Sequence, residues 1–182
     1  MHKCAVFLDR DGTINLDKGY VHRIEDWEWI PGAINAIVAL KKAGYLVVII
    51  TNQAGIARGL YGKTDMIAMH IQVNDALKLY SVEIDGFYHC PHHPEFGEIR
   101  ECECRKPKPG MIMDASREFN IDLSRSWLIG DKASDIHAGL AAGVKSILVL
   151  TGYGSEECDL LDDSSIVAAD IEEASSYILS HN

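Results

Sequence analysis

The sequence predicts an α/β fold, in which helices cover both faces of a doubly wound parallel sheet. Short, almost wholly apolar runs of strand length alternate along the chain with longer segments of helical periodicity. The chain has 182 residues, of which 47% are hydrophobic and 24% are charged, a composition typical of a folded domain with one core. We therefore expect one domain that spans residues 1–182.

Apolar runs indicate the strands. A parallel strand that is buried on both faces carries few polar residues, and a run of this kind is too short to form a helix. These runs lie at 5–8, 46–50, 86–89, 127–129 and 146–150.

Helices are expected between these runs. Thr64 is a candidate N-cap, followed by an apolar face of Met66, Met69, Val73, Leu77 and Tyr80. Pro109 suits a first helical turn, and Asp170 followed by Glu173 resembles a capping box. The predicted helices cover 33–43 and 109–119, then 134–142, with further helices starting at 64 and after 170.

Charge and hydropathy restrict the partners and the location. The net charge of −10, without a basic stripe, disfavours nucleic acid. The longest apolar stretch, 45–50, is too short for a membrane span, and the first residues lack the apolar region of a signal peptide. We therefore expect a cytoplasmic protein. Of the cysteines outside the cluster described below, Cys4 is expected in the core and Cys158 in a helix, as an unpaired thiol.

Polar, chemically useful residues follow four of the predicted strands. Because ligands bind outside the carboxyl ends of parallel strands, these residues are expected at one edge of the sheet. They are Asp9 to Thr13, Thr51 to Gln53, Cys90 to His92, and Gly130 to Lys132.

Asp9 and Asp11 form the first candidate site. Two carboxylates this close require a cation or a shared proton, and Mg²⁺ favours such oxygen ligands. One carboxylate could attack phosphorus while the other transfers protons, with Gly12 allowing a tight turn near the phosphate. A solvated turn rich in aspartate remains the alternative.

Four later residues complete the candidate site. Thr51 offers a hydroxyl, and Lys106 precedes a helix start, where an anion is favoured. Asp131 could complete a magnesium shell, and Asp135 could orient Lys132 or a metal-bound water. Turn chemistry at Thr51, an exposed loop at Lys106 and a helix cap at Asp135 are the alternatives.

A cysteine and histidine cluster predicts a structural zinc site. Three thiolates and one imidazole suffice for a closed tetrahedral site, which would hold a long loop over about 90–105. His93 is a rival for the imidazole position and His89 a weaker one, and unbound cysteines are the alternative. The predicted ligands are Cys90, His92, Cys102 and Cys104.

Taken together, these motifs resemble the haloacid-dehalogenase (HAD) superfamily of phosphohydrolases, whose core is Rossmann-like. The resemblance rests on Asp9 to Thr13, Thr51, Lys106 and the segment 130–135. It implies that Asp9 is the nucleophile and Asp11 the general acid and base. It also implies that Thr51 and Lys106 steady the phosphoryl group, while Asp9, the Asp11 backbone and Asp131 hold magnesium.

Longer motifs are similar to a small zinc-containing group within this superfamily, the heptose bisphosphate and histidinol-phosphate phosphatases, which lack a large cap domain. They include 9–15, 19–22, 51–59 and 104–111. The family often has histidine where Lys18 stands and serine where Ala54 stands. The substrate contacts implied are Asp17, Lys18, Gly19, Tyr20, Thr51, Asn52, Gln53, Ala54, Arg105 and Lys132.

The resemblance implies an enzyme that removes the 7-phosphate of a heptose 1,7-bisphosphate in nucleotide-activated heptose biosynthesis. We expect the protein to be a monomer. Arg105 could grip the second phosphate bidentately. Histidinol phosphate is an alternative substrate, although its amine would favour a carboxylate at Arg105. An inactive, zinc-stapled binding module is another alternative, but at least one of the four motifs would then be broken, and all four are intact. A phosphotransferase is a further alternative, but it would need an insertion large enough to form a lid that keeps water off the phosphorylated intermediate.

Overall fold

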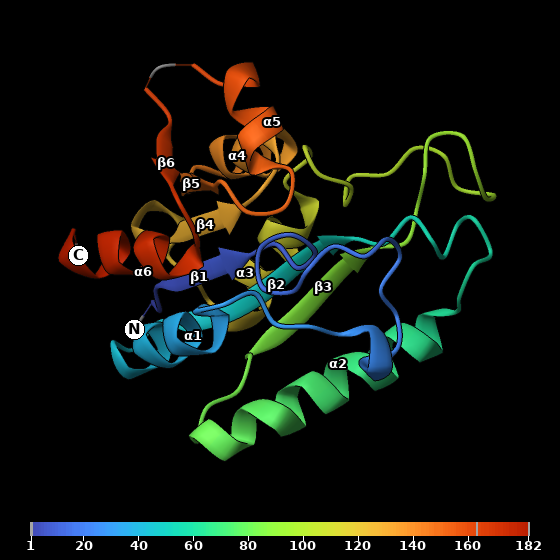
Figure 1. Cartoon of the computed structure of the whole chain (residues 1–182). Coiled ribbons are helices and arrows are strands. Elements are labelled where there is room, and N and C mark those ends of the chain that lie inside the picture. The colour runs from blue at the N-terminus through green and yellow to red at the C-terminus, as the bar shows by residue number, and fades with distance from the viewer. Residues whose placement is uncertain (1, 163, 182) are drawn as a thin grey trace.

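The computed structural model describes residues 2–162 and 164–181. Within these ranges, a six-stranded sheet has the order β3-β2-β1-β4-β5-β6, and each neighbouring pair of strands is parallel (Figure 1). This arrangement confirms the predicted α/β class. The strands are β1 (Ala5–Leu8), β2 (Leu46–Asn52), β3 (Gly86–Cys90), β4 (Trp127–Gly130), β5 (Lys145–Val149) and β6 (Ile166–Ala168).

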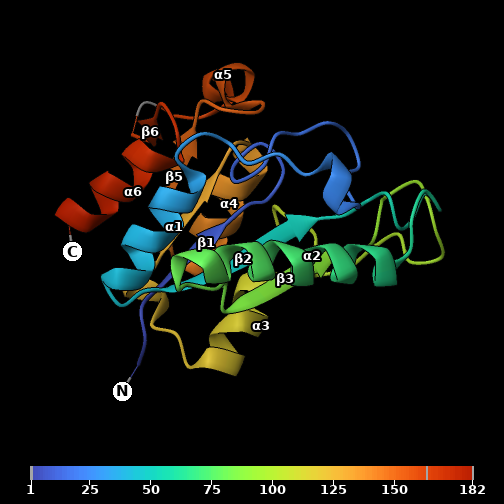
Figure 2. The ribbon, with the colours of Figure 1, turned by 60° about the horizontal axis from the view of Figure 1, so that its bottom comes forward.

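Helices cover both faces of the sheet (Figure 2). One face packs against α1, α2 and α6, and the other against α3 and α4. The short α5 follows β5 beyond the carboxyl edge of the sheet. The helices are α1 (Ala33–Lys42), α2 (Lys63–Leu77), α3 (Gly110–Phe119), α4 (Ala133–Ala142), α5 (Gly154–Glu157) and α6 (Ile171–Ser180).

The central strand β1 contributes to two hydrophobic clusters, one on each face. Val6 and Leu8 belong to the first cluster, whereas Ala5 and Phe7 belong to the second, as the alternation of side chains along a strand requires. All four side chains are buried, which explains the absence of polar residues in this run. Because β1 lies between β2 and β4, the chain reverses its direction of winding there, and this switch point is where ligands bind in such sheets.

The start of α2 differs from the expectation. Gly62, rather than Thr64, is the N-cap, and its backbone N–H donates to Asp65 Oδ2 at 2.8 Å. A carboxylate three residues into the helix thus caps it from inside, which leaves the Thr64 hydroxyl without that role. Met66, Met69, Val73 and Leu77 are buried as predicted, but Tyr80 lies in a 3₁₀ turn and is exposed.

Several smaller predictions also require correction. The three-residue strand β6 was not expected, and β5 runs one residue earlier than the predicted 146–150. Cys4 is only partly buried, and Cys158 lies in a 3₁₀ turn. In α6, Asp170 is the N-cap, but Glu173 accepts from the Ala169 N–H rather than from that of Asp170.

Across residues 2–162 and 164–181, the helices are too short or too polar to cross a membrane.

Candidate active site

Three buried carboxylates meet at the switch point of the sheet. Asp9 follows β1, Asp131 follows β4, and Asp135 lies in the first turn of α4. Asp9 is 6% exposed, and the other two residues are fully buried. One oxygen from each side chain lies within 4.8 Å of the others, so the cluster requires compensating positive charge.

Lys106 supplies part of this charge. Its Nζ donates to Asp9 Oδ1 at 2.6 Å, pairs with Asp135 Oδ1 at 2.5 Å, and donates to the Ile50 carbonyl at 3.0 Å. Burial opposes the ammonium charge, but Asp135 and Asp9 together raise the pKa of Lys106 above its ordinary value. Lys106 is therefore a fixed cation beside the predicted nucleophile.

Asp131 retains an unused ligand position. Its Oδ2 accepts from the Tyr153 N–H at 2.9 Å, whereas its buried Oδ1 has no hydrogen-bond partner. Burial, and then the charge of Asp9, raise the pKa of Asp131 to about 8. Buried carboxylate oxygens of this kind fit a small hard cation such as Mg²⁺, which would relieve the repulsion.

Two glycines allow the chain to pass close to Asp131. A Cβ on Gly12 would lie 2.1 Å from Asp131 Oδ2, and one on Gly152 would lie 2.2 Å from the same atom. Both glycines have positive φ, at +91° and +57°. The Thr151 hydroxyl donates to the Gly12 carbonyl at 2.7 Å, which ties the loop after β5 to the loop after β1.

The Asp11 carboxylate lies outside the metal-like cluster. Its oxygens accept from Arg10 at 2.8 and 2.9 Å, from Asn15 at 3.0 Å and from Gln53 at 3.0 Å. Burial alone would raise the pKa of Asp11, but the adjacent Arg10 charge and these donors lower it overall. The Asp11 carboxylate is therefore engaged by these donors and is not part of the carboxylate cluster of Asp9, Asp131 and Asp135.

A second layer of side chains orders these groups. Gln53 Nε2 donates to both Asp11 and the Thr51 hydroxyl, while the Tyr61 hydroxyl donates to Gln53 Oε1. Burial raises the pKa of Tyr61 to about 12, so its phenol remains a donor. Asn52 forms two hydrogen bonds with the backbone of Lys106, at 3.1 and 3.2 Å, and thereby joins the end of β2 to the lysine loop.

A pocket of about 480 Å³ opens over this site. Most predicted substrate contacts line it, but Lys18 does not and instead pairs with Glu28 at 2.8 Å. Tyr61, Ser134 and Tyr153 also line it and were not predicted as contacts. Ser134 lies in the motif 130–135, whereas no local motif marks the two tyrosines. The predicted residues in its wall are Asp9, Asp11, Asp17, Gly19, Tyr20, Thr51, Asn52, Gln53, Ala54, Arg105, Lys106 and Lys132.

Two further cations border the pocket. Lys132 lies with its Nζ 4.5 Å from the centre of the Tyr153 ring and 3.8 Å from Asp17 Oδ2. The Arg105 guanidinium donates to the His92 carbonyl at 3.0 Å, which anchors it to the cysteine loop. An anion that enters the pocket therefore meets positive charge besides that of Lys106.

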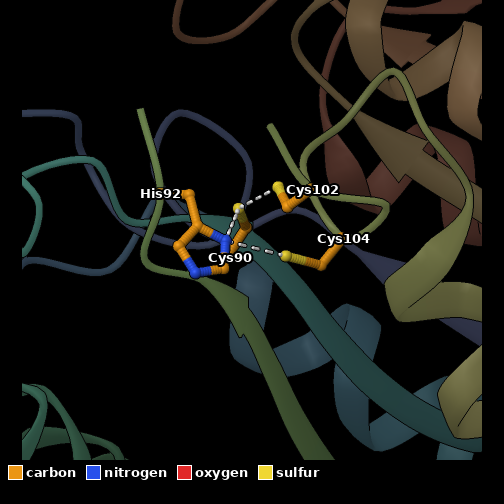
Figure 3. Close-up of side chains that lie close together, drawn as sticks. All are labelled: Cys90, His92, Cys102 and Cys104. Atoms are coloured by element: carbon orange, nitrogen blue, oxygen red, sulfur yellow. Dashed lines mark hydrogen bonds between the residues drawn. The ribbon is translucent and has the colours of Figure 1, made fainter. Parts of the chain in front are cut away.

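The predicted zinc ligands converge, as Figure 3 shows. Cys90 Sγ lies 3.6 Å from Cys102 Sγ, and His92 Nδ1 lies 3.4 Å from Cys104 Sγ. His93 is outside the group, because its Nδ1 accepts from the Glu95 N–H and its Nε2 contacts Arg58. Three sulfurs and one imidazole nitrogen, all within 4.8 Å, are compatible with a tetrahedral zinc site.

The fold and this carboxylate and lysine site define a phosphoric monoester hydrolase with a HAD-like fold. A family model described as HAD-hydrolase-like matches residues 103–174. The crystal structure of D,D-heptose 1,7-bisphosphate phosphatase from B. bronchiseptica, complexed with magnesium and phosphate, is similar with a TM-score of 0.90 and 34% identity. That match covers 98% of this chain and 99% of the B. bronchiseptica chain.

Sequence relatives narrow the class. The D-glycero-beta-D-manno-heptose-1,7-bisphosphate 7-phosphatase of Photorhabdus laumondii is 48% identical over 152 residues, which are 81% of each chain. The enzyme of the same name from Vibrio cholerae is 45% identical over 184 residues, covering 98% of each chain. The chain belongs to the family of D-glycero-beta-D-manno-heptose-1,7-bisphosphate 7-phosphatases.

Proposed function

We propose that this phosphatase removes the 7-phosphate of D-glycero-β-D-manno-heptose 1,7-bisphosphate through an aspartyl-phosphate on Asp9. The observation that carries the proposal is that Lys106 pairs with Asp9 and Asp135, and that these two carboxylates cluster with Asp131, whose Oδ1 has no hydrogen-bond partner. The names of the relatives support this substrate and its β anomer.

The reaction has two steps at phosphorus. In the first, an oxygen of Asp9 attacks and the bond from phosphorus to the sugar oxygen breaks. The sugar oxygen keeps the electron pair of that bond and takes a proton from Asp11, which must therefore be protonated for this step although Arg10 favours its ionised form in the free protein. In the second, water attacks phosphorus and gives its proton to Asp11, while the bond to Asp9 breaks and phosphate leaves. Lys106 holds Asp9 Oδ1, which leaves Oδ2 for the attack.

The residues fit a magnesium ion. The carboxylates of Asp9 and Asp131, with the Asp11 backbone carbonyl, would hold it. When bound, magnesium supplies positive charge that offsets the repulsion between the nucleophile and the phosphate. Asp135 contributes by holding Lys106 and by accepting from the Lys132 N–H at 3.0 Å, so it also caps α4.

The second phosphate requires its own cations. Arg105 and Lys132 line the same pocket as Lys106, and a planar guanidinium binds phosphate oxygens in pairs. Thr51, Asn52, Gln53 and Ala54 would contact the reacting end of the substrate. Asp17, Gly19 and Tyr20 would contact the sugar, whereas the Lys18 ammonium would have to leave Glu28 to take part.

The cluster of Cys90, His92, Cys102 and Cys104 would hold a structural zinc ion. Four protein ligands fill a tetrahedral shell and leave no position for substrate, so the ion would fix the loop that carries Arg105 and Lys106.

A comparison of substrates tests the proposed function. Phosphate release from the heptose bisphosphate, histidinol phosphate and p-nitrophenyl phosphate is measured with the wild type and with Asp9→Asn. We expect the bisphosphate to have the highest kcat/KM and Asp9→Asn to lack turnover, because an amide is a poor nucleophile. Asp114→Asn, the same change on the exposed side of α3, serves as the matched control.

Two results would contradict the proposal separately. A wild-type rate in Asp9→Asn would exclude the covalent mechanism. Faster turnover of histidinol phosphate than of the heptose bisphosphate would exclude the substrate assignment but leave the mechanism intact.

A further inference from the structure

Arg10 is a fully buried cation that the proposed mechanism does not use. Its Nη2 donates to both carboxylate oxygens of Asp11 and, at 2.6 Å, to the Val21 carbonyl. Its Nη1 lies 3.3 Å from Nε2 of His70, which is sixty residues away in the sequence. The guanidinium thus links α2 to the proton-transfer carboxylate.

His70 can serve only as an acceptor in this contact. Arginine has five donor hydrogens and no acceptor, so Nε2 of His70 must carry no proton. The imidazole is 4% exposed and stacks on Phe87, with ring centres 4.5 Å apart and planes 16° from parallel. Burial first, and then the Arg10 charge, lower the pKa of His70 to about 3.

We propose that His70 is a positioning residue for proton transfer, because its Nε2 fixes the Arg10 guanidinium that in turn holds both oxygens of Asp11. The inference rests on the proposed role of Asp11 as general acid and base. The Val21 carbonyl accepts from Nη2, the nitrogen that also donates to Asp11, whereas His70 contacts the other terminal nitrogen, Nη1. Contacts at both terminal nitrogens fix the plane of the guanidinium that faces the carboxylate.

The arrangement matters because proton transfer depends steeply on geometry. A carboxylate that donates to the leaving oxygen and later accepts from water must reach both with short hydrogen bonds. Asn15 and Gln53 each hold one oxygen of Asp11, whereas Arg10 holds both. Loss of the His70 acceptor would leave a buried N–H of Arg10 unpaired, and the guanidinium group could then rotate out of its present plane.

Two substitutions of His70 test the proposal. His70→Leu removes the acceptor but keeps an apolar side chain, whereas His70→Gln places an amide oxygen near the position of Nε2. Met69→Leu, at a neighbouring buried position of α2, is the control for repacking. Thermal unfolding of each variant shows that it is folded before its kinetics are compared.

A comparison of two substrates with different leaving groups separates a defect in proton transfer from a general loss of activity. The value of kcat/KM includes the first chemical step, in which a sugar alkoxide needs a proton but p-nitrophenolate does not. In His70→Leu we expect kcat/KM for the heptose bisphosphate to fall about tenfold, and that for p-nitrophenyl phosphate to change less than about threefold. Slower hydrolysis of the phosphoenzyme in His70→Leu should also produce a burst of p-nitrophenol. In His70→Gln, kcat/KM for the heptose bisphosphate should return toward the wild-type value and the burst should disappear.

Other outcomes would overturn the proposal. Equal losses on the two substrates, or a Gln variant as impaired as the Leu variant, would assign His70 a structural role only. An unchanged His70→Leu enzyme would show that Arg10 holds Asp11 without help. Failure of the proposed function itself would be seen in the wild type, as the absence of turnover or of a phosphoenzyme trapped on Asp9.

Discussion

Arg105 is the residue on which substrate choice depends in the proposed mechanism. It is adjacent to Lys106, lines the pocket, and is anchored to the His92 carbonyl. Arg105→Ala should lower kcat/KM for the bisphosphate by one to two powers of ten, or about 1.4–2.8 kcal/mol, because the distal phosphate loses its bidentate partner. Steady-state kinetics on the bisphosphate and on p-nitrophenyl phosphate measure the effect.

The small substrate is the internal comparison for this change. It lacks a distal phosphate, so its kcat/KM should change much less. Equal losses on both substrates would mean that Arg105 supports the loop or the reacting phosphate instead.

His70 should also leave a signature in the dependence of stability on pH. Its pKa is about 3 in the folded chain, against an ordinary value of 6.5. As the pH falls below 6.5, the unfolded chain binds a proton that the folded chain excludes, so folded stability decreases. The nearby Arg10 and His89 oppose that proton, whereas Asp11 favours it.

His70→Gln removes this titration and provides the reference. Its free energy of unfolding, minus that of the wild type, should shift by about 1.4 kcal/mol in favour of the variant between pH 7.5 and pH 5.5. Urea unfolding at the two pH values measures the shift. A difference that does not vary with pH would show that the imidazole becomes protonated in the folded state.

At the scale of elements, the proposed zinc ion would act on the loop between β3 and α3. This loop carries three of the four predicted zinc ligands, the fourth being Cys90 at the end of β3, and it includes Arg105 and Lys106. Cys102→Ser should lower the melting temperature and raise KM, since the loop would lose its metal and misplace both cations. Elemental analysis of the wild type should find about one zinc per chain.

Cys158→Ser is the matched control, because Cys158 lies in a 3₁₀ turn and outside the cluster. It should retain the metal and the melting temperature. If Cys102→Ser behaved like this control, the cluster would have no stabilising role.

The elements show which parts of the fold a sequence can predict. Strands such as β1 are buried on both faces, so their lack of polar residues is a strong local signal. In contrast, β6 has only three residues, and its central residue Val167 is 40% exposed. So short an apolar run, buried on one face only, cannot be distinguished in the sequence from a loop. The start of α2 depends on Asp65 accepting from Gly62, a contact that competes with the expected Thr64 cap.

The candidate site divides in the same way. Asp9 and Asp131 belong to motifs at strand ends, which the topology brings together, and Lys106 belongs to a motif just before a helix start. His70 and Tyr61 carry no motif, because they reach the site through contacts between distant segments. An amphipathic helix gives a buried histidine the same pattern whether it packs against the core or positions a catalytic group.

At the scale of the whole molecule, a chain with a net charge of −10 must bind a substrate that carries two negatively charged phosphates. The pocket resolves this conflict locally through lysine, arginine and the proposed magnesium. Chelation should stop turnover and added Mg²⁺ restore it, whereas Ca²⁺ should restore it poorly because of its larger and looser shell. A phosphate-release assay with each ion measures the dependence.

Zinc loss complicates that experiment, so the chelated protein is also assayed after zinc and magnesium are added together. Full activity in excess chelator would contradict the magnesium requirement.

The close passage of Gly12 and Gly152 past Asp131 limits how this sequence can vary. Neither position can accept even a methyl group without displacing the carboxylate, and both need a backbone conformation that other residues seldom adopt. Substitution at these two positions should therefore be costly, although neither residue contributes a functional group to the chemistry.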